Sequence, residues 1–233
     1  MKYLTELTDD FLSLLFPRLC HACGNHLLRN ERVICTACYI SIPRTGYHLM
    51  PDNPVAQLFW GRCYIEKAAA FSFYSKGSRI RKLIHRLKYS GVKEIGHELG
   101  RIYAVTLLDS GFARGMDLII PVPLHPVRRR MRGFNQSECI AAGVSEVTSL
   151  AVNDKVLRRI VISSTQTNKS RFERWTNVEG IFSVEDREAV MGKHVLLVDD
   201  VITTGSTIEA CAHELLKVEG VKVSVIAIGC AVM

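Results

Sequence analysis

The chain has 233 residues, of which 48% are hydrophobic and 23% charged, and its formal net charge is +7. This is the composition of a globular protein, and the length suits one main domain with a small appendage. The basic balance favours an anionic partner, such as a phosphorylated small molecule, a nucleic acid or a membrane surface. No apolar stretch is long enough to span a bilayer, and the N-terminus does not resemble a signal peptide. We therefore expect a cytoplasmic protein without membrane insertion.

The first segment of the chain carries apolar residues at helical spacing: Leu4, Leu7, Phe11, Leu14 and Leu15. This spacing predicts an amphipathic helix. We expect it to dock on its own domain rather than to anchor the chain in a membrane.

Cysteines cluster in "CHACGNHLLRNERVICTAC", which contains two Cys-x-x-Cys knuckles formed by Cys20, Cys23, Cys35 and Cys38. In a reducing compartment, paired cysteines favour a metal over disulfides or a single redox pair. Zinc binds four thiolates in a closed tetrahedron, which suits a structural role rather than catalysis. The spacing therefore predicts a four-cysteine zinc ribbon, which could bind nucleic acid, bind protein or only fold the N-terminus.

A polar stretch with Pro43, Pro51 and Pro54 follows the knuckles and is interpreted as a linker. We accordingly divide the chain into residues 1–60, holding the N-terminal helix and the zinc ribbon, and residues 61–233, the main domain.

The main domain alternates predicted strands and helices. Residues 67–91 combine a strand, a turn at Lys76-Gly77 and a basic amphipathic helix, whose charged face is either solvated or anion-binding. "EIGHELGRIYAVTLL", "FNQSECIAAGVSEV" and "STIEACAHELLKVEG" are typical of helices, and "DLIIPVPL", "GKHVLLVDDV" and "KVSVIAIGCAV" of buried strands. This alternation predicts an α/β fold with a parallel sheet covered on both faces.

The stretch "VLLVDDVITTGST" places Asp199 and Asp200 at the end of one such strand, where parallel sheets bind ligands. Gly205 lets the backbone turn towards a ligand, and the following helix N-terminus suits a phosphate. The carboxylates suit sugar hydroxyls, or Mg²⁺ held through water. The stretch lacks the G-x-x-x-x-G-K-[ST] pattern of a P-loop. It therefore indicates a sugar phosphate site, and the alternative is an ordinary Asp-Asp turn with a Thr or Ser helix cap.

This stretch resembles the phosphoribosyl pyrophosphate (PRPP) signature of type I phosphoribosyltransferases. "IRKLIHRLKYSG", "IIPVPLHPVRRRMRGFNQS" and "QTNKSRFERWTNVEGIF", together with the knuckles, resemble the ComF family of bacterial competence-associated proteins. The resemblance implies a Rossmann-like type I phosphoribosyltransferase domain with a parallel sheet, behind a small N-terminal four-cysteine zinc ribbon.

The resemblance also implies roles for individual residues. Asp199 and Asp200 would be the catalytic acids that hold the ribose, and the backbone of residues 124–128 would lie near the pyrophosphate. Residues 164–177 would close over the substrate. The implied PRPP-binding set is Val201, Thr203, Thr204, Gly205, Ser206, Thr207, Arg128, Arg132, Lys169 and Arg171. Structural Zn²⁺, and Mg²⁺ bound with PRPP, are the implied cofactors.

Departure of pyrophosphate builds positive charge on the ribose, which the acids could stabilise while Mg²⁺ and arginines stabilise the leaving group. The arginine run around Arg128 and Arg132 has the alternative of a solvated basic loop. In "RGFNQ", Phe134 could equally be a core anchor, and Asn135 and Gln136 could hydrogen-bond the backbone.

We therefore expect a PRPP-binding phosphoribosyltransferase of the glycosyltransferase class, Mg-dependent and with an unknown acceptor. By resemblance, it would serve natural competence, transformation and DNA uptake. The alternative is a non-catalytic accessory protein that binds single-stranded DNA or a helicase-like competence ATPase. A purely zinc-based nucleic-acid module would leave the acid and hydroxyl signature unexplained. The sequence does not indicate an oligomeric state.

Overall fold

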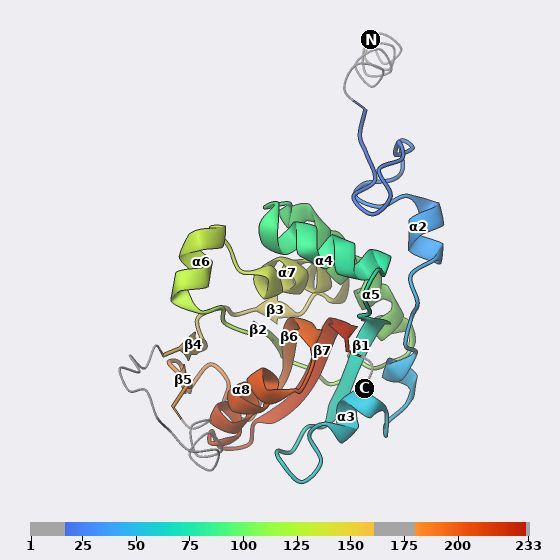
Figure 1. Cartoon of the computed structure of the whole chain (residues 1–233). Coiled ribbons are helices and arrows are strands. Elements are labelled where there is room, and N and C mark those ends of the chain that lie inside the picture. The colour runs from blue at the N-terminus through green and yellow to red at the C-terminus, as the bar shows by residue number, and fades with distance from the viewer. Residues whose placement is uncertain (1–16, 161–179, 232–233) are drawn as a thin grey trace, which may run out of the picture.

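The computed structural model describes residues 17–160 and 180–231. Its centre is a five-stranded parallel sheet with the strand order β1-β7-β6-β2-β3 (Figure 1). The strands are β1 (Lys67–Phe73), β2 (Leu118–Pro121), β3 (Ala151–Val152), β6 (His194–Ile202) and β7 (Lys222–Cys230). The predicted parallel α/β sheet is confirmed.

Helices cover both faces of this sheet. The helices α4 (Arg79–Tyr89), α5 (Lys93–Asp109) and α7 (Gln136–Thr148) lie on one side, and α8 (Ser206–Leu216) lies on the other (Figure 1). Side chains alternate along β6, so Leu196 and Val198 join the core under the first layer, while Val195 and Leu197 join the core under α8. A short antiparallel pair, β4 (Leu157–Arg159) and β5 (Phe182–Val184), extends the α8 side.

Glycines bring α5 and α7 into backbone contact. A Cβ atom at Gly143 would lie 1.9 Å from the carbonyl oxygen of His97, and one at Gly100 would lie 2.2 Å from that of Ile140. Any side chain at either position would push the helices apart. This close approach fixes α7, whose N-terminus reaches the carboxyl edge of the sheet.

The segment predicted to be a linker is instead packed against the main domain, so that prediction is wrong. It forms α2 (Thr36–Ile40), a 3-10 helix η1 (Tyr47–Leu49) and α3 (Pro54–Gln57). The buried Asn53 amide donates to the carbonyl oxygens of Met50 and Ala68, each at 2.7 Å, and thereby ties the segment to β1. Val55 and Phe59 are buried in the core on the α8 side, so hydrophobic burial also holds the segment in place.

The other predicted elements of the main domain lie where the sequence indicated, including the turn at Lys76-Gly77. One helix was not expected: α6 (Pro126–Arg132) forms from the basic run after "PVPLHP". Proline at its first turn has a preset helical φ, and Gly133 ends it at a φ of 76°. The arginine run is therefore helical rather than a loop, while Arg128, Arg129 and Arg130 are exposed, as the interpretation of a solvated basic run expected.

Candidate functional site

The carboxyl end of β6 and the loop into α8 enclose a small cavity. Asp199, Val201 and Ile202 line it together with residues 203–208. Gly205 caps α8 with a φ of 77°, so the chain turns sharply, and residues 206–208 of the first helical turn line the cavity. The first backbone N–H groups of a helix have no partner within the helix. The predicted residues from Val201 to Thr207 are thus brought together with Asp199 at a helix N-terminus, where backbone N–H groups favour an anion.

Asp199 is held by two donors. Its Oδ1 atom accepts hydrogen bonds from the Ser137 hydroxyl at 3.1 Å and from the Asp200 backbone N–H at 2.8 Å. The close packing of protein around this carboxyl group, and the negative charge of Asp200, raise the pKa of Asp199 to about 7. Asp199 is therefore a weaker acid than an exposed aspartate.

Asp200 is engaged differently. It is buried, and its Oδ1 atom accepts from the Lys88 ammonium of α4 at 2.8 Å. No sequence pattern indicated this partner, because the two residues are separated by 112 positions.

The loop between β6 and α8 is also held from the N-terminal part of the chain. Arg62 donates to the carbonyl oxygens of Leu58 at 3.0 Å and Thr204 at 3.1 Å, and it forms an ion pair with Glu209. A Cβ atom at Gly205 would lie 3.0 Å from the Phe59 ring, so that ring packs closely on the turn. Sequence reasoning missed Arg62, which belongs to no recognisable motif.

The predicted arginines occupy α6. Arg128 is exposed, whereas Arg132 places its guanidinium 5.3 Å from the centre of the Tyr89 ring. Arg129 pairs with Glu138 at 2.9 Å. Lys169 and Arg171, and the whole segment 164–177, lie outside the described residues.

The residues after α6 confirm part of the structural interpretation of "RGFNQ". Phe134 is buried in the core, and Asn135 caps α7 by accepting from the Ser137 N–H while its amide donates to the carbonyl oxygen of Val122 at 3.0 Å. Gln136 is buried, but its Nε2 atom has no hydrogen-bond partner among the described residues. Asn135 therefore links the end of β2 to the start of α7, two residues from the Ser137 that binds Asp199.

A larger cavity of about 430 Å³ lies beyond the carboxyl end of β2. Its walls come from the loop after β2, from α6, from the start of α7 and from residues 154–159. Basic and acidic side chains both line it: Arg129, Lys155, Arg158, Arg159, Glu138, Asp154 and Glu185. Because β2 pairs with β6, this charged cavity lies beside the strand that carries the two acids.

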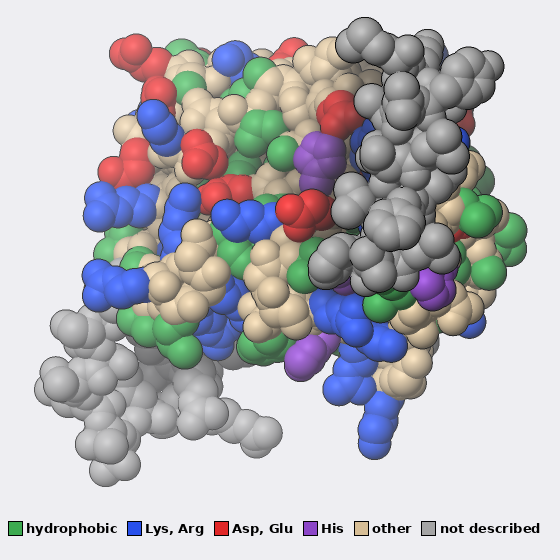
Figure 2. Space-filling model, turned by 90° about the horizontal axis from the view of Figure 1, so that it is seen from above, with side chains coloured by type: hydrophobic (Ala, Val, Ile, Leu, Met, Phe, Trp, Pro, Cys, Tyr) green, Lys and Arg blue, Asp and Glu red, His purple; other side chains and the backbone are tan. Residues whose placement is uncertain are grey.

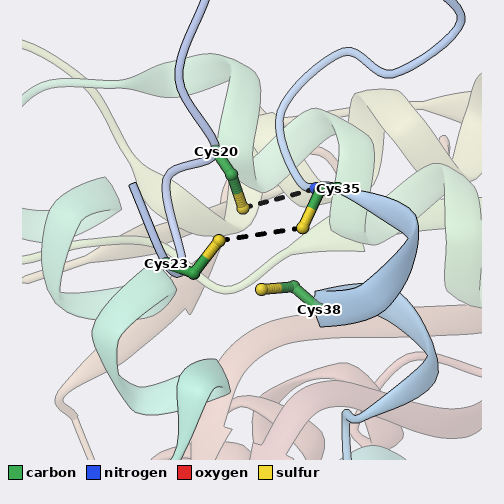
Figure 3. Close-up of side chains that lie close together, drawn as sticks. All are labelled: Cys20, Cys23, Cys35 and Cys38. Atoms are coloured by element: carbon green, nitrogen blue, oxygen red, sulfur yellow. Dashed lines mark hydrogen bonds between the residues drawn. The ribbon is translucent and has the colours of Figure 1, made fainter. Parts of the chain in front are cut away.

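The four knuckle cysteines converge, as Figure 3 shows. Their sulfur atoms all lie within 4.8 Å of one another, and those of Cys23 and Cys35 are 3.7 Å apart. A tetrahedron with zinc–sulfur bonds of about 2.3 Å places its sulfurs roughly 3.8 Å apart. All four thiols are free, so the disulfide alternative is not realised. The cluster fits a structural zinc ion.

Thiol ionisation in the cluster is uneven. Burial opposes ionisation of Cys20, but backbone N–H groups, foremost that of Cys35 at 3.3 Å, outweigh it and lower the pKa of Cys20 to about 6. Burial and the neighbouring sulfurs raise the pKa of Cys38. Four adjacent thiolates repel one another, and a bound dication would remove that repulsion.

The ribbon packs against the same layer of helices that supplies the side-chain partners of the two acids. Cys20, Cys35 and Cys38 are buried in the core that contains the apolar face of α4. Arg86 of α4 lies 3.4 Å from the Nδ1 atom of His21, which is inside the first knuckle. Within residues 17–160 and 180–231, no helix has the length and apolarity needed to cross a bilayer.

Comparison with known proteins gives this arrangement a family. Residues 131–233 match the pattern described as "Phosphoribosyl transferase domain". The chain is 31% identical over 215 residues to the DNA utilization protein YhgH of Shigella flexneri, covering 88% of this chain and 93% of that protein. It is 28% identical to competence protein F of Haemophilus influenzae, covering 86% of this chain and 91% of that protein. It is 25% identical to competence protein ComFC of Bacillus subtilis, with coverage of 93% and 86%.

The chain belongs to the ComF family. The expected resemblance, and a phosphoribosyltransferase domain within this ComF-family chain, are thereby confirmed.

Among solved structures, the glutamine PRPP amidotransferase of B. subtilis has a TM-score of 0.40 at 24% identity, covering 56% of this chain and 25% of that one. The adenine phosphoribosyltransferase of Leishmania tarentolae has a TM-score of 0.39 at 10% identity, with coverage of 82% and 94%.

Zinc is expected to hold the ribbon without being needed for the main sheet. Protein purified under reducing conditions should contain one zinc ion per chain, and Cys38→Ser should lose it. Hydrogen exchange should then accelerate in residues 17–40, while the amides of β6 and β7 stay protected. Cys63→Ser, at a half-buried cysteine outside the cluster, is the control and should keep the metal. Zinc-free wild-type protein would refute the four-cysteine assignment.

The raised pKa of Asp199 predicts a pH-dependent stability. In the unfolded chain the pKa of this carboxyl group is about 4, whereas in the folded protein it is about 7. Between these two pH values the folded protein therefore binds more protons than the unfolded chain. As the pH rises from about 4 to about 7, Asp199 should therefore lower the free energy of unfolding, and its contribution should stop changing above about pH 7. Asp199→Asn should remove this contribution in urea titrations at several pH values. Asp109→Asn, on an exposed carboxylate at the end of α5, should retain it. Identical pH profiles for wild type and Asp199→Asn would contradict the assignment.

Proposed function

We propose that this ComF-family chain binds PRPP, with Mg²⁺, at the carboxyl end of β6 and transfers its phosphoribosyl group to an acceptor that the sequence does not identify. The observation that carries the proposal is the joint position of an acidic pair and a hydroxyl-rich turn at one strand end. The phosphoribosyltransferase domain supports PRPP as the ligand.

Each part of the pocket suits a different part of PRPP. The amides and hydroxyls of residues 203–207 would bind the 5′-phosphate, because a helix N-terminus and adjacent hydroxyls both donate to phosphate oxygens. The Arg62 contacts hold that turn in shape before the ligand arrives. Asp199 and Asp200 would accept from the ribose hydroxyls, and these carboxyl groups could also hold Mg²⁺ through water.

The same groups can assist the reaction. When the bond between C1 of the ribose and the diphosphate oxygen breaks, positive charge develops on the sugar ring, and a bond from the acceptor then forms at C1. Carboxylates fixed beside the ring stabilise that charge, because their orientation is set before the reaction begins. When bound, Mg²⁺ would neutralise charge on the departing diphosphate. The charged cavity beyond β2 offers space next to the acids for groups attached at C1.

Calorimetric titration tests this proposal. PRPP should bind the zinc-loaded protein in the presence of Mg²⁺ and more weakly without it. Asp199→Asn combined with Asp200→Asn should weaken binding at least about 100-fold, because hydrogen bonds to charged groups contribute about 1.5–3 kcal/mol each. Asp109→Asn should bind as the wild type does. If both acids can be replaced without loss of affinity in a folded protein, their proposed role is wrong. Candidate acceptors can then be screened by the release of pyrophosphate.

We also propose, as a second function, binding of single-stranded DNA along the exposed basic face of α4. Relatives are named for DNA utilization and competence, and Arg79, Arg81 and Lys82 are exposed on this helix. Figure 2, which looks down on the helix layer, shows Lys and Arg side chains gathered at one border and mixed with acidic side chains elsewhere. A helicase-like competence ATPase as partner, and a cytoplasmic location, remain predictions of the family resemblance.

Salt dependence distinguishes this DNA surface from a merely solvated one. Binding of a labelled single strand should weaken steeply as salt rises, because phosphate contacts release counterions. Arg81→Ala combined with Lys82→Ala should reduce the slope of log affinity against log salt by about 1.4, or about 0.7 per lost contact. A slope equal to that of the wild type would exclude this face. Absence of DNA binding even at low salt would leave PRPP binding as the only function proposed.

A further inference from the structure

An ion pair that no motif indicated reaches into the acidic pair. The Lys88 ammonium lies 2.8 Å from Asp200 Oδ1, and the two side chains are 22% and 11% exposed. A pair this sheltered is only weakly screened by salt. Lys88 and Asp200 line neither the cavity at residues 199–208 nor the one beyond β2, but the 22% exposure of Lys88 leaves its ammonium accessible beside Asp199 and Asp200.

The fold imposes this meeting. Leu83, Ile84 and Leu87 bury one face of α4 in the core that it shares with α5 and the sheet, which fixes the helix and leaves Lys88 in its last turn. A cation in that position is favoured by the partial negative charge of the helix C-terminus. Asp200 lies on the same side of β6 as Val198, which belongs to the core under α4. Lys88 thus contacts Asp200 while α4 remains a regular helix and β6 a regular strand.

Lys88 has more donor capacity than Asp200 uses. A lysine ammonium carries three N–H groups, and Asp200 is its one acceptor among the residues that the structure describes. The remaining N–H groups can donate to a ligand while the ion pair stays formed. An ammonium forms a stronger hydrogen bond with a charged phosphate oxygen than with a neutral ribose hydroxyl.

The position of the neighbouring residue indicates which phosphate lies within reach. Tyr89 follows Lys88, and its ring contacts the guanidinium of Arg132 at 5.3 Å from ring centre to Cζ. The last turns of α4 and α6 therefore meet, and α6 directly follows the loop after β2. The 5′-phosphate site belongs to the turn at residues 203–207, which follows the two acids in the sequence and is separate from the β2 loop and α6. Lys88 is thus associated with the β2 loop and α6, where the group attached to C1 would lie.

We propose that Lys88 binds the diphosphate group of the substrate, holding Asp200 in the free protein and donating its remaining N–H groups to diphosphate oxygens in the complex. This inference rests on the proposed PRPP function and adds a ligand contact from outside the PRPP signature. The diphosphate is the leaving group, so a fixed ammonium beside it stabilises the negative charge that develops as the bond to C1 breaks. Arg132, across the Tyr89 contact, is a further cation near the end of α4.

The competing explanation is that the ion pair is purely structural. The affinities for fragments of PRPP distinguish the two explanations. If Lys88 only positions Asp200, its loss affects ligands that contain ribose and spares free pyrophosphate. If Lys88 contacts the diphosphate, its loss weakens pyrophosphate as well as PRPP. Ribose 5-phosphate, which lacks the diphosphate, should then be affected least.

The experiment titrates PRPP, inorganic pyrophosphate and ribose 5-phosphate, each with Mg²⁺, into the full-length zinc-loaded protein and its Lys88→Met variant. We expect affinity for PRPP and for pyrophosphate to fall at least about tenfold, the effect of losing one hydrogen bond to a charged group. Affinity for ribose 5-phosphate should change less than about threefold. Lys88→Arg should restore most of the pyrophosphate affinity, because it keeps the positive charge.

Lys217→Met is the matched control. Lys217 pairs with Glu214 at 2.7 Å near the end of α8, but its side chain is 53% exposed and lies outside the pocket. It should leave all three affinities unchanged. Thermal unfolding checks each variant, and Lys88→Gln replaces Lys88→Met if the apolar side chain prevents folding.

Unchanged pyrophosphate affinity in the folded Lys88→Met variant overturns the proposal. The proposal is also wrong if the variant loses affinity equally for PRPP and for ribose 5-phosphate but keeps its affinity for pyrophosphate. In both cases the wild type still binds PRPP, so the proposed function survives. A wild-type protein that binds none of the three ligands instead refutes the proposed function, and the role of Lys88 with it.

Discussion

Two adjacent carboxyl groups at the end of a hydrophobic strand set the constraint on which the rest of the site depends. Both side chains are largely removed from water, and their charges repel, so each requires a partner from another part of the chain. Ser137 and the Asp200 backbone N–H serve Asp199, while Lys88 serves Asp200. The side-chain partners lie at the start of α7 and at the end of α4. The glycine contact between α5 and α7 therefore matters at the site, because it fixes the helix that carries Ser137.

The N-terminal part of the chain contributes to the same site, although its motif belongs to a different chemistry. Asn53 fastens the segment to β1, and Arg62 then reaches the turn at Thr204. The turn is thus shaped from outside its own strand and helix. A division of the sequence that ends the first unit near residue 60 follows the change in composition, but it does not reveal that residues 53–60 pack on the main domain. Burial of Val55 and Phe59 supplies the reason, since an apolar run as short as residues 55–60 is too brief to show a helical or strand period.

Local pattern was sufficient for most of the fold. Continuous apolar runs located β2, β6 and β7, and helical spacing located α4, α5, α7 and α8, because those signals depend on neighbouring residues. The two acids, the hydroxyl-rich turn after them and the cysteine knuckles could likewise be recognised as short motifs. Contacts between distant segments were not: Lys88 looked like any basic residue on an amphipathic helix, and Arg62 belonged to no pattern. The α6 helix was missed because its arginines resemble a loop, whereas the proline before them and Gly133 after them define a short helix.

The last turn of α4 joins the two chemistries of the chain. Arg86 lies beside His21 within the first Cys-x-x-Cys knuckle, and Lys88, two positions later, holds Asp200. Because the apolar face of α4 is fully buried, this turn cannot move freely towards one partner and away from the other. The ribbon therefore acts on the pocket as a support for α4, rather than as a module that moves independently of it. A closed four-cysteine site would suit that arrangement, because a metal bound there would only have to hold the ribbon against α4.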